Sequence, residues 1–111
     1  MDISEAKNRY NDLGQDQKTD FLIRFSHALT KTGRECYEFD GDGVKHPKLL
    51  RYINEMQHRI MGAAMHIRLR KPEEETRDWI VELMLKHDNA LLKDRSVRAF
   101  EDSISAVSSQ E

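Results

Sequence analysis

The chain has 111 residues, of which 38% are hydrophobic and 34% charged, and its 18 basic and 20 acidic residues give a net charge of -2. A chain of this length forms one domain, and its charge balance excludes a global attraction to nucleic acid or anionic membranes. The single cysteine, Cys36, excludes an internal disulfide framework and a multi-cysteine zinc site, and it fits a reducing compartment. With no visible secretory signal and no apolar run long enough to span a membrane, we expect a soluble cytoplasmic protein without a membrane partner.

The first predicted helix is short and thinly apolar. It covers residues 4–14, where helical spacing relates three side chains: Ala6, Tyr10 and Leu13. Ser4 is a typical N-cap residue, and Gly14 is a typical residue at a helix end. The segment is therefore predicted to be a helix that either packs through these side chains or frays as a chain terminus.

The second predicted helix, residues 16–33, belongs to the core. Apolar side chains recur along it at helical spacing, namely Phe21, Leu22, Phe25, Ala28 and Leu29. Gly33 stands where a C-terminal glycine is expected, so the helix is predicted to end there. His27 falls off the apolar stripe and is expected to be exposed.

Residues 34–46 are predicted to form a loop that is long for a connection between helices. Its acidic run has the spacing of the first ligands and the glycine of a calcium loop, at Glu38, Asp40, Asp42 and Gly43. Leu49 stands where such a loop needs a bidentate glutamate, so a solvated acidic turn is favoured. Cys36 is near His27 and His46 in sequence, but this does not make a catalytic dyad, and a small buried hydrophobe is favoured.

Residues 47–70 carry the strongest helical pattern in the chain. Pro47 suits the first turn, and an uninterrupted apolar stripe follows it: Leu49, Ile53, Met56, Ile60, Ala63, Ala64 and Ile67. A second apolar group spreads round the side of the helix: Leu50, Met61, Met65 and Leu69. A helix with so wide an apolar surface is either central in a bundle or buried by a second chain. We favour a homodimer through the second group, because 111 residues supply little helical surface to cover two faces.

Two further helices are predicted after this one. Residues 72–92 place three glutamates in the first turn, where the helix dipole favours anions, and a buried stripe follows: Trp79, Ile80, Leu83 and Met84. Residues 93–107 carry a similar stripe of Val97, Phe100, Ile104 and Val107. The predicted fold is all-α: a compact bundle of three long helices and one or two short ones over residues 1–107, with residues 108–111 as a flexible tail. Seven residues are predicted to be largely buried: Phe21, Phe25, Ile53, Ile60, Trp79, Leu83 and Phe100.

The remaining face of the helix over residues 47–70 is basic, through Arg51, Arg59, His66 and Arg70. An arginine stripe of this kind can contact the phosphates of nucleic acid. The alternative is a solvated face with i, i+4 ion pairs, such as Glu55 with Arg59. The solvated face is favoured, because the chain is acidic overall and no aromatic residues interleave with the arginines.

Glu55 and His58 have the Glu-x-x-His spacing that helical di-iron carboxylate bundles use twice to bind metal. Here the two residues lie on the outer side of the helix and the motif stands alone, so no metal and no cofactor are predicted. The stretch LRYINEMQHRI around them resembles the phosphoacceptor helix of histidine kinases, which implies an exposed His58 or His66 as the acceptor. The resemblance covers one helix and no ATP-binding domain accompanies it, so no residue role is taken from it.

The sequence favours a non-enzymatic role, because it contains no glycine-rich phosphate loop, no G-x-S-x-G and no H-E-x-x-H motif. The predicted function is that of a small helical interaction protein, a homodimeric regulator or adaptor that acts by binding a protein partner. Two alternatives stay open. One is a nucleic-acid-associated protein that uses the arginine stripe, and the other is a metal-binding or histidine-phosphotransfer bundle centred on His58.

Overall fold

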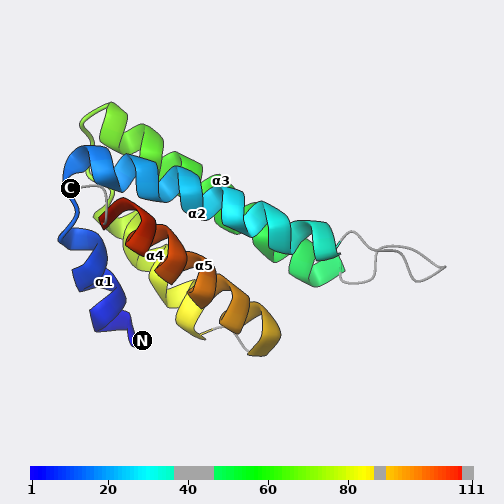
Figure 1. Ribbon diagram of the computed structural model, residues 1–111. Helices are drawn as coiled ribbons and strands as arrows, with labels where there is room; N and C mark the ends of the chain where they lie inside the picture. The colour runs from blue at the N-terminus through cyan, green and yellow to red at the C-terminus, as the bar shows by residue number, and fades with distance from the viewer. Residues whose placement is uncertain (37–46, 87–89, 109–111) are drawn as a thin grey trace.

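The computed structural model is a helical bundle, described over residues 1–36, 47–86 and 90–108, without the side chains at 32–33, 35–36, 47–50 and 90–92 (Figure 1). Its helices are α1 (Ile3–Asn11), α2 (Gln15–Cys36), α3 (Pro47–Arg68), α4 (Glu74–Lys86) and α5 (Ala90–Ser108). The described segments contain no strand. Three helices are long, at 22, 22 and 19 residues, and two are shorter, at 9 and 13, so the predicted all-α bundle is confirmed. None of the described helices could cross a membrane.

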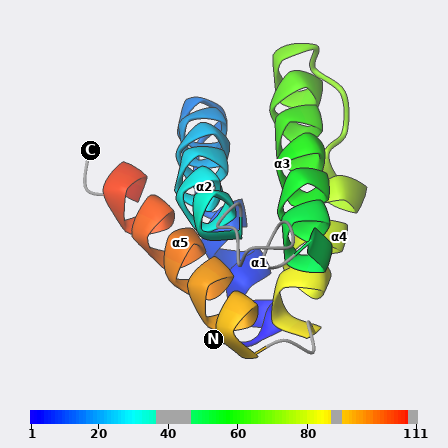
Figure 2. The ribbon, with the colours of Figure 1, turned by 90° about the vertical axis from the view of Figure 1, so that its right-hand side faces the viewer.

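α2 and α3 form the long antiparallel hairpin of the bundle, and they lie side by side in both views (Figures 1 and 2). α4 packs against α3, α5 packs against α2, and α4 and α5 contact each other. These four helices therefore close a ring, and α1 packs against α4 and adds Ala6 and Tyr10 to the core. One side of the hairpin faces the core, and its other side is left without a covering helix in the described segments.

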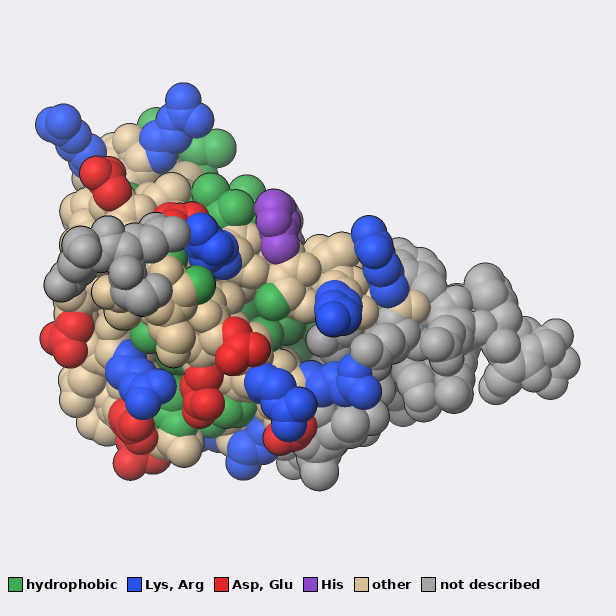
Figure 3. Space-filling model, in the orientation of Figure 1, with side chains coloured by type: hydrophobic (Ala, Val, Ile, Leu, Met, Phe, Trp, Pro, Cys, Tyr) green, Lys and Arg blue, Asp and Glu red, His purple; other side chains and the backbone are tan. Residues whose placement is uncertain are grey.

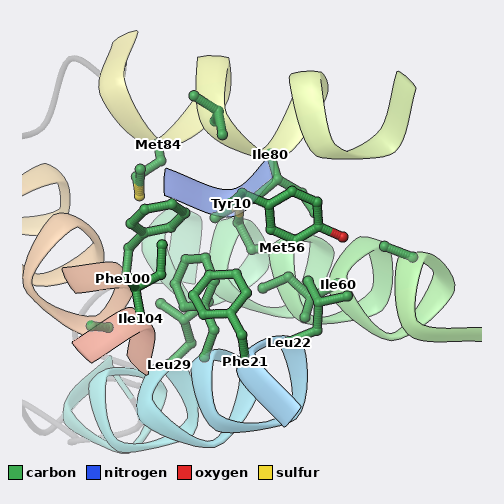
Figure 4. Close-up of a cluster of buried hydrophobic side chains, with 14 of the residues drawn as sticks. Tyr10, Phe21, Leu22, Leu29, Met56, Ile60, Ile80, Met84, Phe100 and Ile104 are labelled. Atoms are coloured by element: carbon green, nitrogen blue, oxygen red, sulfur yellow. The ribbon is translucent and has the colours of Figure 1, made fainter. Parts of the chain in front are cut away.

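The core is built around aromatic rings that come from three helices (Figure 4). The ring centroids of Phe21 and Phe100 lie 5.1 Å apart, those of Phe21 and Phe25 5.6 Å, and those of Tyr10 and Phe21 5.8 Å. Phe100 meets Phe21 and Phe25 edge to face, which suits the charge distribution of the rings. Five of the seven predicted core residues are buried: Phe21, Phe25, Ile53, Ile60 and Phe100.

The other two predicted core residues, Trp79 and Leu83, are only partly buried, which corrects the prediction. Of the predicted stripe, α4 buries Ile80 and Met84, and it buries Val81 in addition. Residues 79–85 are apolar at every position except Glu82, so periodicity alone does not select the buried face of this helix. The contacts of α4 with α1, α3 and α5 select it.

The sequence predicted that Gly14 ends the first helix, but Gly14 directly precedes the first residue of α2. Its N–H donates to the side-chain oxygen of Gln17 at 2.9 Å, and its carbonyl accepts from the N–H of Lys18 at 2.9 Å. These contacts satisfy backbone groups that the first turn of α2 would otherwise leave unpaired. The N-cap of α1 is Asp2 rather than Ser4, and its carboxylate accepts from the N–H of Glu5 at 2.7 Å.

Two other predicted helix ends were wrong. α2 continues through Gly33 to Cys36, because one glycine costs a helix only about 1 kcal/mol and no proline follows until residue 47. The predicted helix over residues 72–92 is two helices, since α4 ends at Lys86 and α5 begins at Ala90. Ser108, assigned to the predicted tail, is the last residue of α5, and residues 109–111 lie outside the described chain.

α3 ends in a left-handed turn at Arg70, whose φ is 57°. The N–H of Lys71 donates to the carbonyl of His66 at 2.7 Å, and the N–H of Arg70 donates to the carbonyl of Ile67 at 3.0 Å. These two hydrogen bonds form a Schellman motif, in which glycine usually takes the left-handed position. An arginine at this position stores backbone strain at the end of the helix.

Replacement of Ile60 by Ala should lower the free energy of unfolding by about 2–5 kcal/mol, because the side chain is 0% exposed and its loss leaves a cavity. Urea denaturation followed by circular dichroism measures the change. The matched control is His58→Ala, an exposed site on the same helix, which should change stability by no more than about 0.5 kcal/mol. Similar losses at both positions would show that the buried stripe of α3 is misplaced.

Replacement of Arg70 by Gly should raise the free energy of unfolding by about 1 kcal/mol, because the left-handed conformation costs a residue with a Cβ roughly 1–2 kcal/mol and glycine returns part of that in chain entropy. Arg70→Ala removes the same charge but keeps the strain, so it should bring no comparable gain. An equal gain in both variants would assign the effect to the charge and not to the backbone.

Candidate interaction face

Four large hydrophobic side chains are exposed in the described part of the chain: Ile23 at 38%, Met61 at 49%, Met65 at 53% and Leu69 at 55%. Three of them, Met61, Met65 and Leu69, belong to the predicted dimer contact. The side chain of the fourth predicted member, Leu50, lies outside the description. Figure 3 shows hydrophobic side chains along the upper edge of the molecule, where the C-terminal half of α3 lies, with charged side chains beside them.

Three of these side chains, Ile23, Met61 and Met65, line a groove of about 1150 Å³ between the first half of α2 and the second half of α3. Its apolar lining includes Ile23, Met61, Ala64 and Met65. Its charged rim has acidic residues on the α2 side, Asp16 and Asp20, and basic residues at the end of α3, Arg68, Arg70 and Lys71. We call this surface, together with Leu69, the hairpin face.

The helical repeat explains why α3 supplies both the core and the hairpin face. Ile60 is 0% exposed and points into the bundle, whereas Met61 follows about 100° further round the helix and is 49% exposed. Met65 and Leu69 continue the line of Met61 at intervals of four residues. Methionine side chains are flexible and polarizable, and they suit a surface that adapts to a partner.

A buried polar cluster adjoins the groove, and its central residue, Glu73, is one of the lining residues. Glu73 is 7% exposed, and its Oε1 accepts from the Tyr10 hydroxyl at 3.4 Å and lies 3.8 Å from the Lys18 Nζ. Lys18 also lies over the Tyr10 ring, 5.2 Å from its centroid. A buried carboxylate needs such partners, so the cluster holds α1, α2 and the start of α4 together.

The contacts between α1 and α4 also shift the pKa values of two side chains, Tyr10 and Asp78. Burial first, and then the charge and hydrogen bond of Glu73, raise the pKa of the Tyr10 phenol, while Arg77 acts in the opposite direction. Burial acts to raise the pKa of Asp78, but a hydrogen bond and charge from Arg77 and the charge of Lys7 hold it below its usual value. Arg77 Nη2 lies 2.8 Å from Asp78 Oδ1, and Lys7 Nζ lies 3.5 Å from the same oxygen, which adds an ionic link between α1 and α4.

The predicted arginine stripe is divided by contacts with the rest of the bundle. The guanidinium of Arg59 lies 5.1 Å from the ring centroid of Trp79, so it stacks on α4. The Nδ1 of His66 lies 3.2 Å from the carbonyl oxygen of Pro72. Arg51 and Arg70 are exposed. Two of the four side chains thus contact the protein itself, which sequence reasoning missed because it depends on where α4 packs.

Glu55 and His58, the candidate metal ligands, are both exposed. Among the described residues, no group of three or more His, Cys, Asp or Glu side chains is placed to hold a metal ion. The calcium-like run Glu38, Asp40, Asp42 and Gly43 lies outside the described residues, as do His46 and the side chain of Cys36. The predictions for these residues therefore stay as the sequence leaves them. His27 is exposed, as predicted.

Comparison with known proteins finds no matching family model, no matching characterised protein and no matching solved structure. The resemblance of LRYINEMQHRI to the phosphoacceptor helix of histidine kinases gains no support from a wider match.

The two buried tyrosines of the described chain should make stability fall with rising pH above about 10. Burial raises the pKa of Tyr52 from 10.0 to about 12, and burial also raises the pKa of Tyr10. The folded protein then holds protons that the unfolded chain releases, so the unfolding free energy falls between pH 10 and 12 by up to about 1.4 kcal/mol per pH unit for each phenol. Urea titrations at several pH values give the unfolding free energy as a function of pH, and this free energy should fall less steeply above pH 10 in Tyr52→Phe. An unchanged pH dependence would contradict this assignment.

Proposed function

We propose that this protein is a non-catalytic interaction protein, a regulator or adaptor that works as a homodimer in the cytoplasm and docks through the hairpin face. The observation that carries the proposal is the exposure of about half of each of three neighbouring large side chains: Met61, Met65 and Leu69. Over the described segments the only other exposed large hydrophobic side chain is Ile23, which lines the same groove as Met61 and Met65. A contiguous apolar patch with a polar rim marks a protein interaction site.

The composition of the hairpin face also supports a protein partner. Methionine and arginine are enriched at protein interfaces, and charged residues collect at the rim rather than the centre. Here Met61 and Met65 line the groove together with the charged residues Asp16, Arg68 and Lys71. A second copy of the chain is the simplest protein partner, because most oligomers of soluble proteins are symmetric homo-oligomers.

Nucleic acid is the weaker alternative on the same evidence. Asp16, Asp20 and Glu74 line the groove beside the exposed basic residues, and their carboxylates would repel phosphates. Arg59 and His66 already contact Trp79 and the Pro72 carbonyl, which leaves fewer cations on the stripe to neutralise a phosphate backbone.

The test is the solution mass over a range of concentrations, by light scattering after size exclusion. The wild-type protein should approach twice 13.0 kDa as its concentration rises. Met65→Glu should raise the dissociation constant at least about a hundredfold, because the interface would bury an unpaired carboxylate. Ser105→Glu adds the same charge at an exposed site on α5 and should leave the dimer intact. A wild-type mass of 13.0 kDa at several hundred micromolar (about the limit for a functional weak dimer) would overturn the proposal.

A further inference from the structure

The antiparallel packing of α2 and α3 determines which residues of the hairpin face lie at the same height. The side-chain amide of Gln57 donates to the Ser26 carbonyl at 2.8 Å and to the Thr30 hydroxyl at 2.6 Å, so residue 57 lies level with residues 26–30. Counted back along α2 and forward along α3, Asp16 lies level with the end of α3 near Arg68. By the same count, Ile23 lies level with Met61. The lining of the groove agrees, because it includes all four residues.

The two walls of the groove carry opposite charge. The α2 wall contributes Asp16 and Asp20 and no basic residue, and Asp20 already pairs with Arg24 at 3.1 Å. The α3 wall contributes Arg68 and no acidic residue, and the turn after it adds Arg70 and Lys71. Beyond this turn, the buried Glu73 and the exposed Glu74 also line the groove. Asp16 and these three basic residues are all exposed. The hairpin face is therefore acidic along one edge and basic at the same height along the other.

A twofold axis can relate two such faces in two principal ways. If the axis runs across the hairpins, α2 faces α2 and α3 faces α3, so acidic wall meets acidic wall. If the axis runs along the hairpins, α2 of one copy faces α3 of the other at the same height. Asp16 then lies opposite Arg68 of the second copy, and Ile23 lies opposite its Met61. Symmetry repeats both pairings, so each favourable contact occurs twice.

We propose that two copies of this chain dock with the twofold axis along their α2–α3 hairpins, so that each acidic wall lies against the basic wall of the other copy. The inference rests on the proposed homodimer and adds its orientation. Charge complementarity of this kind selects the orientation of a complex and disfavours the arrangement that brings like charges together. An anionic lipid surface or nucleic acid would instead set negative charge against Asp16 and Asp20, so neither fits both walls.

Disulfide trapping between single-cysteine chains tests the orientation. In full-length protein with Cys36→Ser, one chain carries Asp16→Cys and a second, tagged to differ in mass, carries Arg68→Cys. After mixing and mild oxidation, the mixed disulfide should exceed either homotypic disulfide at least about fivefold, since only residues at matched positions reach bonding distance. The matched control mixes Asp16→Cys with Ser105→Cys, which places the second thiol on exposed α5 and should give only background.

Charge reversal gives a second readout that does not depend on oxidation. Asp16→Arg and Arg68→Asp should each raise the dissociation constant of the dimer about tenfold or more, and an equal mixture of the two variants should restore dimerisation. A dimer of normal mass that gives homotypic disulfides, or whose charge variants are not rescued by mixing, would overturn the orientation and leave the homodimer standing. A monomeric parent protein would overturn the proposed function itself.

Discussion

The packing of one side of α3 against the rest of the bundle is the constraint on which the other features depend. α2 and α4 pack against α3, whose buried stripe includes Ile53, Met56 and Ile60, and all three side chains are at most 1% exposed. No other helix in the described segments packs over the neighbouring side of α3, which carries Met61 and Met65. When a helix has two apolar stripes and the fold buries only one, the other remains as an exposed apolar surface that favours association. The hairpin face is exposed because the bundle covers only one of the two apolar stripes of α3.

The rest of the bundle holds that face in a fixed shape. The aromatic centre locks α2 against α5, and the Glu73 cluster fixes the turn between α3 and α4 against α1 and α2. Breaking a buried ionic contact by removing one partner costs far more than an exposed pair does, so this turn is held more firmly than its surface position suggests. The strained Arg70 lies in the same turn and lines the groove. Strain kept at such a position is typical of a surface that serves binding rather than stability.

Periodicity predicted most of the fold, because the core stripes of α2, α3 and α5 are long and regular. It failed at Gly33, because a glycine can stand inside a helix as well as at its end. It failed in part over residues 79–85, because nearly every side chain there is apolar and the pattern does not show which ones are buried. Three members of the hairpin face were predictable, since Met61, Met65 and Leu69 share one line of α3. Ile23 and the acidic wall were not, because their place beside α3 depends on the tertiary pairing of the two helices. The Arg59 contact with Trp79 was hidden for the same reason.

Methionine oxidation under single-hit peroxide exposure tests the central claim most directly, since it reports on the hairpin face residue by residue. Met61 and Met65 are about half exposed, while Met56 and Met84 are 0% exposed and serve as internal references in the same chain. If a second copy covers the face, the oxidation rates of Met61 and Met65, followed by peptide mass spectrometry, should fall severalfold between low micromolar and several hundred micromolar protein, as expected for a weak dimer. The rates of the two buried methionines should stay low throughout. Rates for Met61 and Met65 that do not change with protein concentration would contradict the account.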